Sequence, residues 1–161
     1  MVLILFGVSG AGKTVVGRLL AKELEWPFYD GDTYHSPVSV EKMRHGVPLT
    51  NADRQPWLDT LRGLVVRCLE TGENAVLACS ALKAAYRDHL RVDDRVKLVH
   101  LEGDFELIAK RLRERRNHFM NAELLASQFE TLEEPRGEAL VVDVSSSPHE
   151  VVGEIRARLG V

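Results

Sequence analysis

The sequence predicts an α/β protein in which a mainly parallel sheet is covered by helices on both faces. Three observations support this prediction. A glycine-rich segment lies between an apolar run and an amphipathic run. Apolar segments then alternate with amphipathic segments along all 161 residues. No repeat, low-complexity tract or linker divides the sequence, so we expect a single domain over residues 1–161.

Composition narrows the kinds of partner that the protein can have. The apolar content of 45% and the charged content of 28% are ordinary for a soluble globular domain. The net charge of −3 gives no general attraction to nucleic acid or to a membrane, so we expect neither as a partner. Cys68 and Cys79 form no C-x-x-C pair and no disulfide framework, which favours a reducing, cytoplasmic location. The apolar run at the N-terminus is too short to span a membrane.

The glycine-rich segment is the strongest functional signal in the chain. It follows the apolar run Met1–Phe6, which predicts a strand buried on both faces, and it opens a helix over Lys13–Leu24. In such a loop, successive backbone N–H groups surround a phosphate, and the helix N-terminus adds partial positive charge. Lys13 would face the β- and γ-phosphates, and the Thr14 hydroxyl could bind Mg²⁺. The predicted nucleoside triphosphate site matches G-x-x-x-x-G-K-[ST] and consists of Gly7, Val8, Ser9, Gly10, Ala11, Gly12, Lys13 and Thr14.

The remaining elements continue the same alternation. In a sheet whose parallel strands are connected by helices, ligands bind at the carboxyl ends of the strands. The catalytic and binding residues should therefore come just after each strand. A capping box of Ser147 and Glu150 should open the last helix. The predicted strands are Met1–Phe6, Phe28–Asp30, Ala75–Cys79, Val96–Glu102 and Ala139–Val144. The predicted helices are Lys13–Leu24, Val38–His45, Ala52–Thr71, Lys83–Arg91, Phe105–Arg115, Ala122–Glu133 and His149–Leu159.

Two carboxylates follow the second predicted strand. Asp30 could hold Mg²⁺ through water, because a hard cation prefers oxygen ligands and keeps part of its hydration shell. Asp32 could accept the proton of an attacking hydroxyl or hold that hydroxyl in line with the γ-phosphate. Gly31 would let the backbone turn between them. By itself D-G-D is also an ordinary turn signal, and its place beside a phosphate loop favours the functional interpretation.

Arg54 lies one helical turn before Trp57 and Leu58, at the start of an inward-facing apolar stripe. An arginine in that place either binds an anion, such as a substrate carboxylate, or covers the core with its aliphatic stem. Trp57 is better explained as a core residue than as a surface that stacks on a ligand.

A cationic run ends the helix predicted over Phe105–Arg115. Such a run is usually a solvated helix end, but in a phosphoryl-transfer enzyme it can form a lid that neutralises charge and excludes water. The cationic run consists of Lys110, Arg111, Arg113, Arg115, Arg116 and His118.

The six histidines have no metal-ligand spacing, so the sequence predicts no zinc site.

Several segments together resemble the gluconate kinases of the small phosphate-loop type. They are GVSGAGKT, FYDGDTYHSPVSVEKMRHGVPLTNADRQPWL, CSALKAAYRDHLR, LEGDFELIAKRLRERRNHF, QFETLEEP and LVVD, and they extend to about residue 145. D-G-D-x-x-H, D-R-x-P-W-L and C-S-A-L-K are specific motifs. The resemblance implies a three-layer P-loop kinase fold, as in nucleoside monophosphate and shikimate kinases, with a five-stranded parallel sheet.

The resemblance also implies an activity. It is the ATP-dependent phosphorylation of D-gluconate on its 6-hydroxyl, with Mg²⁺, to give 6-phospho-D-gluconate and ADP in gluconate catabolism that feeds the pentose phosphate pathway. A substrate-binding helical segment would span about residues 35–70, a lid would lie near residues 112–124, and the protein would be a homodimer. Lys13, Asp32 and Arg115 would be catalytic, and Arg111 would lie against the adenine. By motif position, the residues facing the sugar acid would be Asp32, His35, Arg54 and Arg87.

Two other functions fit parts of the sequence. Shikimate also offers a carboxylate and hydroxyls, so residue spacing alone does not separate a shikimate kinase or a nucleoside monophosphate kinase from a gluconate kinase. A nucleotide-dependent switch protein is a different class, but the guanine-reading N-K-x-D motif and a D-x-x-G switch after a strand are absent from the sequence.

Overall fold

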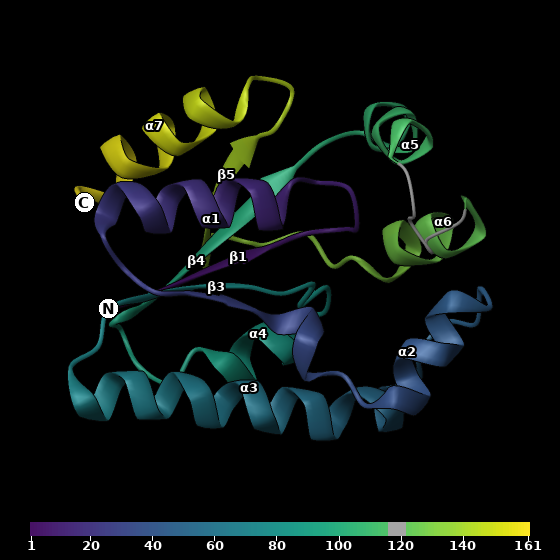
Figure 1. Ribbon diagram of the computed structural model, residues 1–161, viewed down its shortest axis with the longest axis horizontal. Helices are drawn as coiled ribbons and strands as arrows, with labels where there is room; N and C mark the ends of the chain where they lie inside the picture. The colour runs from purple at the N-terminus through teal and green to yellow at the C-terminus, as the bar shows by residue number, and fades with distance from the viewer. Residues whose placement is uncertain (116–121) are drawn as a thin grey trace.

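The computed structural model describes residues 1–115 and 122–161. Within these ranges a five-stranded parallel sheet has the strand order β2-β3-β1-β4-β5 (Figure 1). The predicted α/β fold with a parallel sheet is confirmed. Strand ends agree with the sequence prediction to within one residue. The strands are β1 (Val2–Phe6), β2 (Phe28–Asp30), β3 (Ala75–Ala78), β4 (Val96–Glu102) and β5 (Ala139–Asp143).

Helices cover both faces of this sheet. Figure 1 shows α1 and α7 packed together on one face and α3 with α4 on the other. The helices are α1 (Lys13–Leu24), α2 (Pro37–Arg44), α3 (Asn51–Thr71), α4 (Ala84–Leu90), α5 (Phe105–Glu114), α6 (Ala122–Thr131) and α7 (Pro148–Leu159), with a 3₁₀ helix η1 (Gly31–Tyr34). Among the described residues, none of these helices is both long and apolar enough to cross a membrane.

The central strand β1 explains why the first apolar run is unbroken. Side chains alternate between the two faces of a strand, so a strand covered on both sides is apolar at every position. Leu3 and Leu5 pack into the core beneath α1 and α7, whereas Val2, Ile4 and Phe6 pack into the core beneath α3 and α4. Since β1 lies between β3 and β4, the loop that follows it emerges at the middle of the carboxyl edge.

Local signals set the helix ends. Ser147 accepts a hydrogen bond from the Glu150 N–H, and the Glu150 side chain accepts one from the Ser147 N–H, which confirms the predicted capping box. Thr50 and Asp53 form a second capping box at the start of α3. Of the predicted lid, residues 116–121 lie outside the described part of the chain, and α5 and α6 flank them.

Candidate active site

A cavity of about 750 Å³ opens at the carboxyl edge of the sheet. Its lining combines the end of the glycine loop, the start of α1, η1, α3, α5, α6 and the start of α7. This is the place that the parallel-sheet rule predicts. The predicted site residues that line it are Ser9, Gly10, Ala11, Gly12, Lys13, Thr14, Asp30, Asp32, His35, Arg54, Arg111 and Arg115.

The glycine loop has the backbone of an anion cradle. Gly10 and Gly12 have φ angles of 84° and 95°, a region that disfavours residues with a Cβ. A Cβ on Gly10 would also lie 3.0 Å from side-chain atoms of Ile108 and Leu112 on α5. Gly12 is the N-cap of α1 and supplies no side-chain cap, so the first N–H groups of α1 remain available to a phosphate. The loop therefore fits the polyphosphate of a nucleotide.

Lys13 lies inside this loop. Its ammonium donates to the carbonyl oxygens of Gly7 at 3.0 Å and Val8 at 2.9 Å. Those two residues do not line the cavity themselves; they hold the lysine in place. Burial lowers the pKa of Lys13, and the carboxylates of Asp32 and Asp30 partly oppose that shift. A phosphate oxygen would supply the negative charge that favours the ammonium form.

Asp30 ends β2 and caps η1, and Asp32 lies within η1. Asp30 caps this turn, and its Oδ1 accepts a hydrogen bond from the Asp32 N–H at 3.0 Å. Gly31 fits between them because it packs against β3, where an added Cβ would lie 2.6 Å from the Ala78 carbonyl oxygen. The sequence interpretation invoked a turn at Gly31, and the structure instead requires a glycine for close approach. Both carboxylates line the cavity near Lys13.

Trp57 fixes the position of Gly31 and of the predicted site residue His35. It is buried in the core, as predicted, and its Nε1–H donates to the Gly31 carbonyl oxygen at 2.7 Å. His35 stacks on the indole with ring centroids 4.3 Å apart and an interplanar angle of 14°. Burial lowers the pKa of His35, and its Nδ1 has no hydrogen-bond partner among the described residues. A neutral imidazole facing the cavity is therefore free to bond a ligand hydroxyl.

Arg54 is half-buried on the first turn of α3 and lines the cavity. Its Nη1 donates to the Tyr86 hydroxyl at 3.4 Å, and the guanidinium carbon lies 5.8 Å from the Tyr86 ring centroid. Tyr86 in turn hydrogen-bonds the Asn51 side chain, which also accepts a bond from Lys83. Among the described carboxylates, none is within ion-pair distance of Arg54. The arginine is thus oriented by α4 while its charge stays available to an anion.

Two arginines from the end of α5 and the residue after it line the cavity. Arg111 donates to the Val144 carbonyl oxygen beside the start of α7, and Arg115 is exposed at the end of α5, where it also lines the cavity. Helix α6 contacts the loop directly, because Gln128 Oε1 accepts a hydrogen bond from the Ser9 N–H at 2.7 Å. Gln128 opens the segment QFETLEEP, but the sequence analysis assigned it no role, because spacing along the chain does not show that it meets a loop so far away.

The structure does not bring Arg87, which the resemblance places against the sugar acid, into the cavity. Its side chain is fully buried outside the cavity lining. The guanidinium donates to the carbonyl oxygens of Ala81, Leu82 and Glu133 at 2.8–3.1 Å, and it pairs with Glu138 at 3.3 Å. A charge buried among so many acceptors is a structural anchor, because it joins the end of β3 to the segment that precedes β5.

Comparison with known proteins gives consistent results. The chain matches the shikimate kinase family over residues 9–159. A probable gluconokinase of Rattus norvegicus is 47% identical over 89% of this chain and 88% of its own length. A gluconokinase of Gluconobacter oxydans is 47% identical over 91% of this chain and 83% of its own length. The crystal structure of a gluconokinase from Sinorhizobium meliloti has a TM-score of 0.87 and 41% identity, covering 98% of this chain and 90% of that one.

The glycine cradle, its lysine and their place on the parallel sheet define a P-loop kinase. Within that class, the chain belongs to the gluconokinase family, because relatives of that family cover about nine-tenths of it at more than 40% identity. The protein is therefore an enzyme.

Proposed function

We propose that this kinase transfers the γ-phosphoryl group of ATP to the 6-hydroxyl of D-gluconate, giving 6-phospho-D-gluconate and ADP. One observation carries the proposal. A single cavity holds the phosphate loop with Lys13, and the same cavity is lined by Arg54, a cation without a carboxylate partner among the described residues. Such a cavity suits a substrate that carries both a carboxylate and a hydroxyl to be phosphorylated. The relatives named gluconokinases support gluconate as that substrate.

The proposed roles follow from the side chains in the cavity. Asp32 accepts the proton of the 6-hydroxyl or orients that hydroxyl toward the γ-phosphate. Lys13 and Arg115 neutralise charge on the transferring phosphoryl group. Arg54 binds the gluconate carboxylate through two parallel N–H donors, and His35 hydrogen-bonds the hydroxyls. In this arrangement the substrate segment spans about residues 35–70, and the lid spans about residues 112–124.

The nucleotide and its metal fit the same wall of the cavity. The positive-φ glycines and the uncapped start of α1 suit a polyphosphate, and Arg111 would lie against the adenine. Thr14 and Asp30 are oxygen donors, the type of ligand that Mg²⁺ prefers, and both line the cavity. When bound, Mg²⁺ would neutralise charge on the β- and γ-phosphates. We also propose a cytoplasmic homodimer that serves gluconate catabolism and so feeds the pentose phosphate pathway; sedimentation of the purified protein tests the dimer.

An ADP-release assay across gluconate, shikimate, glucose and nucleoside monophosphates tests the proposed reaction. ADP release should require gluconate and Mg²⁺, with the other acceptors near background. The match to the shikimate kinase family makes shikimate the comparison that matters most. Equal turnover of shikimate or of a nucleoside monophosphate would overturn the gluconate assignment.

A further inference from the structure

His100 is a buried histidine outside the active-site cavity. It lies on β4, is 1% exposed, and stacks on Phe6 with ring centroids 4.9 Å apart. Its Nδ1 has no hydrogen-bond partner among the described residues. Buried polar atoms nearly always have a partner, because leaving one unpaired costs free energy. Stacking on Phe6 alone therefore does not account for a histidine here.

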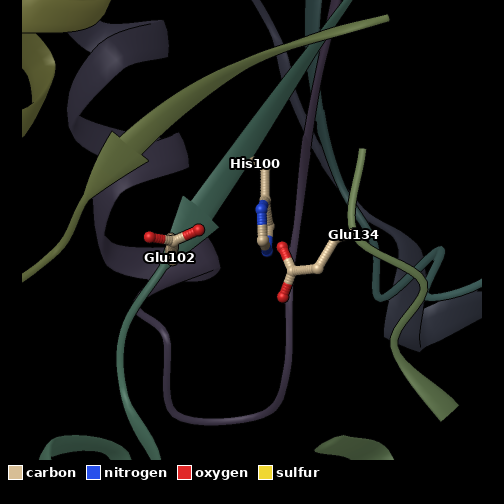
Figure 2. Close-up of side chains that lie close together, drawn as sticks. All are labelled: His100, Glu102 and Glu134. Atoms are coloured by element: carbon tan, nitrogen blue, oxygen red, sulfur yellow. The ribbon is translucent and has the colours of Figure 1, made fainter. Parts of the chain in front are cut away.

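Two carboxylates approach this ring from two parts of the chain. Glu102 lies two residues after His100, so it shares the same side of β4. Glu134 comes from the segment that joins α6 to β5. A ring nitrogen of His100 and one oxygen of each carboxylate all lie within 4.8 Å of one another. Figure 2 shows the imidazole between the two carboxylates. Both glutamates are exposed and form no ion pair or side-chain hydrogen bond within the described residues.

The backbone that carries Glu134 is held in place. The neighbouring Glu133 N–H donates to the Leu82 carbonyl oxygen at 2.9 Å, and its carboxylate accepts from the Ala84 N–H at 3.0 Å. Its carbonyl oxygen accepts a bond from the buried Arg87 at 2.8 Å. These three bonds fasten the segment to the stretch after β3 and to the start of α4, so Glu134 does not sit on a free loop.

We propose that His100, Glu102 and Glu134 bind one divalent transition metal ion of the zinc type. A neutral imidazole and two carboxylates are an accepted ligand set for such ions, whereas Mg²⁺ prefers oxygen ligands throughout. A tetrahedral zinc ion needs ligand atoms ~3.3 Å apart, since the metal–ligand bonds are ~2.0–2.1 Å. The three ligand atoms lie within 4.8 Å of one another, so rotations of the two exposed glutamate side chains would bring them to this spacing. Water would complete the coordination.

Charges near His100 act in both directions. Burial and the nearby Arg87 guanidinium lower the pKa of His100 to about 4, so the ring is neutral at pH 7 and keeps a lone pair for a metal. The positive charge of Arg87 also opposes a cation here, and the two carboxylates supply the negative charge that offsets it. The histidine spacing predicted no zinc site, because the ligands come from two segments and two of them are glutamates.

This metal would join β4 to the segment that follows α6. Helix α6 contacts the phosphate loop through Gln128 and Ser9, so the ion would stabilise one wall of the active-site cavity. None of its three ligands lines that cavity. The site is therefore separate from the Mg²⁺ that we propose at Asp30.

Calorimetric titration of the full chain with Zn²⁺, without nucleotide and in millimolar Mg²⁺, tests the site. The wild type should bind one Zn²⁺. Glu134→Gln and Glu102→Gln should each lower the affinity for this ion at least ~10-fold, because loss of even an outer-shell partner costs ~10–100-fold in affinity. Glu70→Gln, which removes an exposed carboxylate of α3, is the matched control and should bind as the wild type does.

Thermal melting gives a second readout that does not depend on activity. At free Zn²⁺ near 100 times its Kd, the wild type and Glu70→Gln should melt roughly 5–10 °C higher than without the metal. The shift should shrink in Glu134→Gln and Glu102→Gln, whose exposed side chains are dispensable for the core. Unchanged zinc affinity in both variants, or no binding by the wild type, would overturn the proposal. Binding that Asp30→Asn abolishes and Glu134→Gln retains would also overturn it, because the ion would then occupy the nucleotide site.

Discussion

Arg54→Lys tests the proposed carboxylate clamp most directly. The substitution keeps a positive charge on the first turn of α3 but replaces a planar fork of donors with a single ammonium group. Within residues 1–115 and 122–161, only one nitrogen of Arg54 is engaged, through a long 3.4 Å bond to the Tyr86 hydroxyl. The remaining donors are available for the substrate, so the variant should lose substrate contacts more than protein contacts.

The expected loss follows from the number of bonds removed. Hydrogen bonds to charged groups contribute about 1.5–3 kcal/mol each in net terms. Lysine retains the charge and one bond, so the loss should lie near the lower end, about 1.5 kcal/mol. Since 1.36 kcal/mol corresponds to a factor of ten, the KM for gluconate should rise roughly tenfold where KM follows binding. The KM for ATP should change less than about twofold, because the phosphate loop does not contact Arg54.

The assay is a two-substrate kinetic matrix on the wild type and two variants. Arg62→Lys is the control, because Arg62 lies on the same helix, donates to the His89 carbonyl oxygen, and does not line the cavity. This control should leave both KM values near the wild type. If the ATP KM rose as much as the gluconate KM in Arg54→Lys, or if the control matched it, Arg54 would serve the nucleotide or the fold and the clamp would be refuted.

Four further predictions concern Lys13, Asp32, Arg87 and His100. Lys13→Ala should lower kcat by at least ~100-fold with an unchanged circular dichroism spectrum; a variant with half its activity would contradict the role. Asp32→Asn should lower kcat far more than ATP affinity, measured by steady-state kinetics and nucleotide titration, and an unchanged kcat would make Asp30 the next candidate. Arg87→Met should destabilise by about 3–5 kcal/mol in urea unfolding, because Glu138 and three carbonyl oxygens each lose a charged donor; a stable variant with raised gluconate KM would support the substrate role. The folded pKa of His100, about 4, lies below its ordinary value of 6.5, so the stability that the neutral ring contributes is complete above pH 6.5 and is lost as pH falls toward 4. Urea unfolding across that range should show the loss, and His100→Phe, which keeps a ring against Phe6, should lack that part of the pH dependence.

Local signals made much of the fold and part of the site predictable. The glycine loop is encoded in consecutive residues, since each glycine permits a backbone angle that the cradle needs. Helix ends followed from capping residues such as Ser147, and the parallel sheet followed from apolar strands that alternate with helices. The rule that ligands meet the carboxyl edge then placed Asp30 and Asp32 in the cavity, because it depends on strand order along the chain alone.

Arg87 marks the limit of that reasoning. Its motif position implied a substrate contact, but whether an arginine points into a cavity or into the core depends on which acceptors lie around it. Those acceptors come from Ala81, Leu82, Glu133 and Glu138, and the last two are more than forty residues away in sequence. Their convergence is a property of packing.

The sequence by itself determined the fold class, the phosphate loop and the family, because these depend on short-range backbone preferences, apolar periodicity and motifs of consecutive residues. Only the tertiary structure decided that Trp57 holds both Gly31 and His35, and that Gln128 meets the loop at Ser9. It likewise brought Glu134 beside His100. The physical reason is that such contacts join side chains from separate elements, and their distances are set only when the helices pack on the sheet.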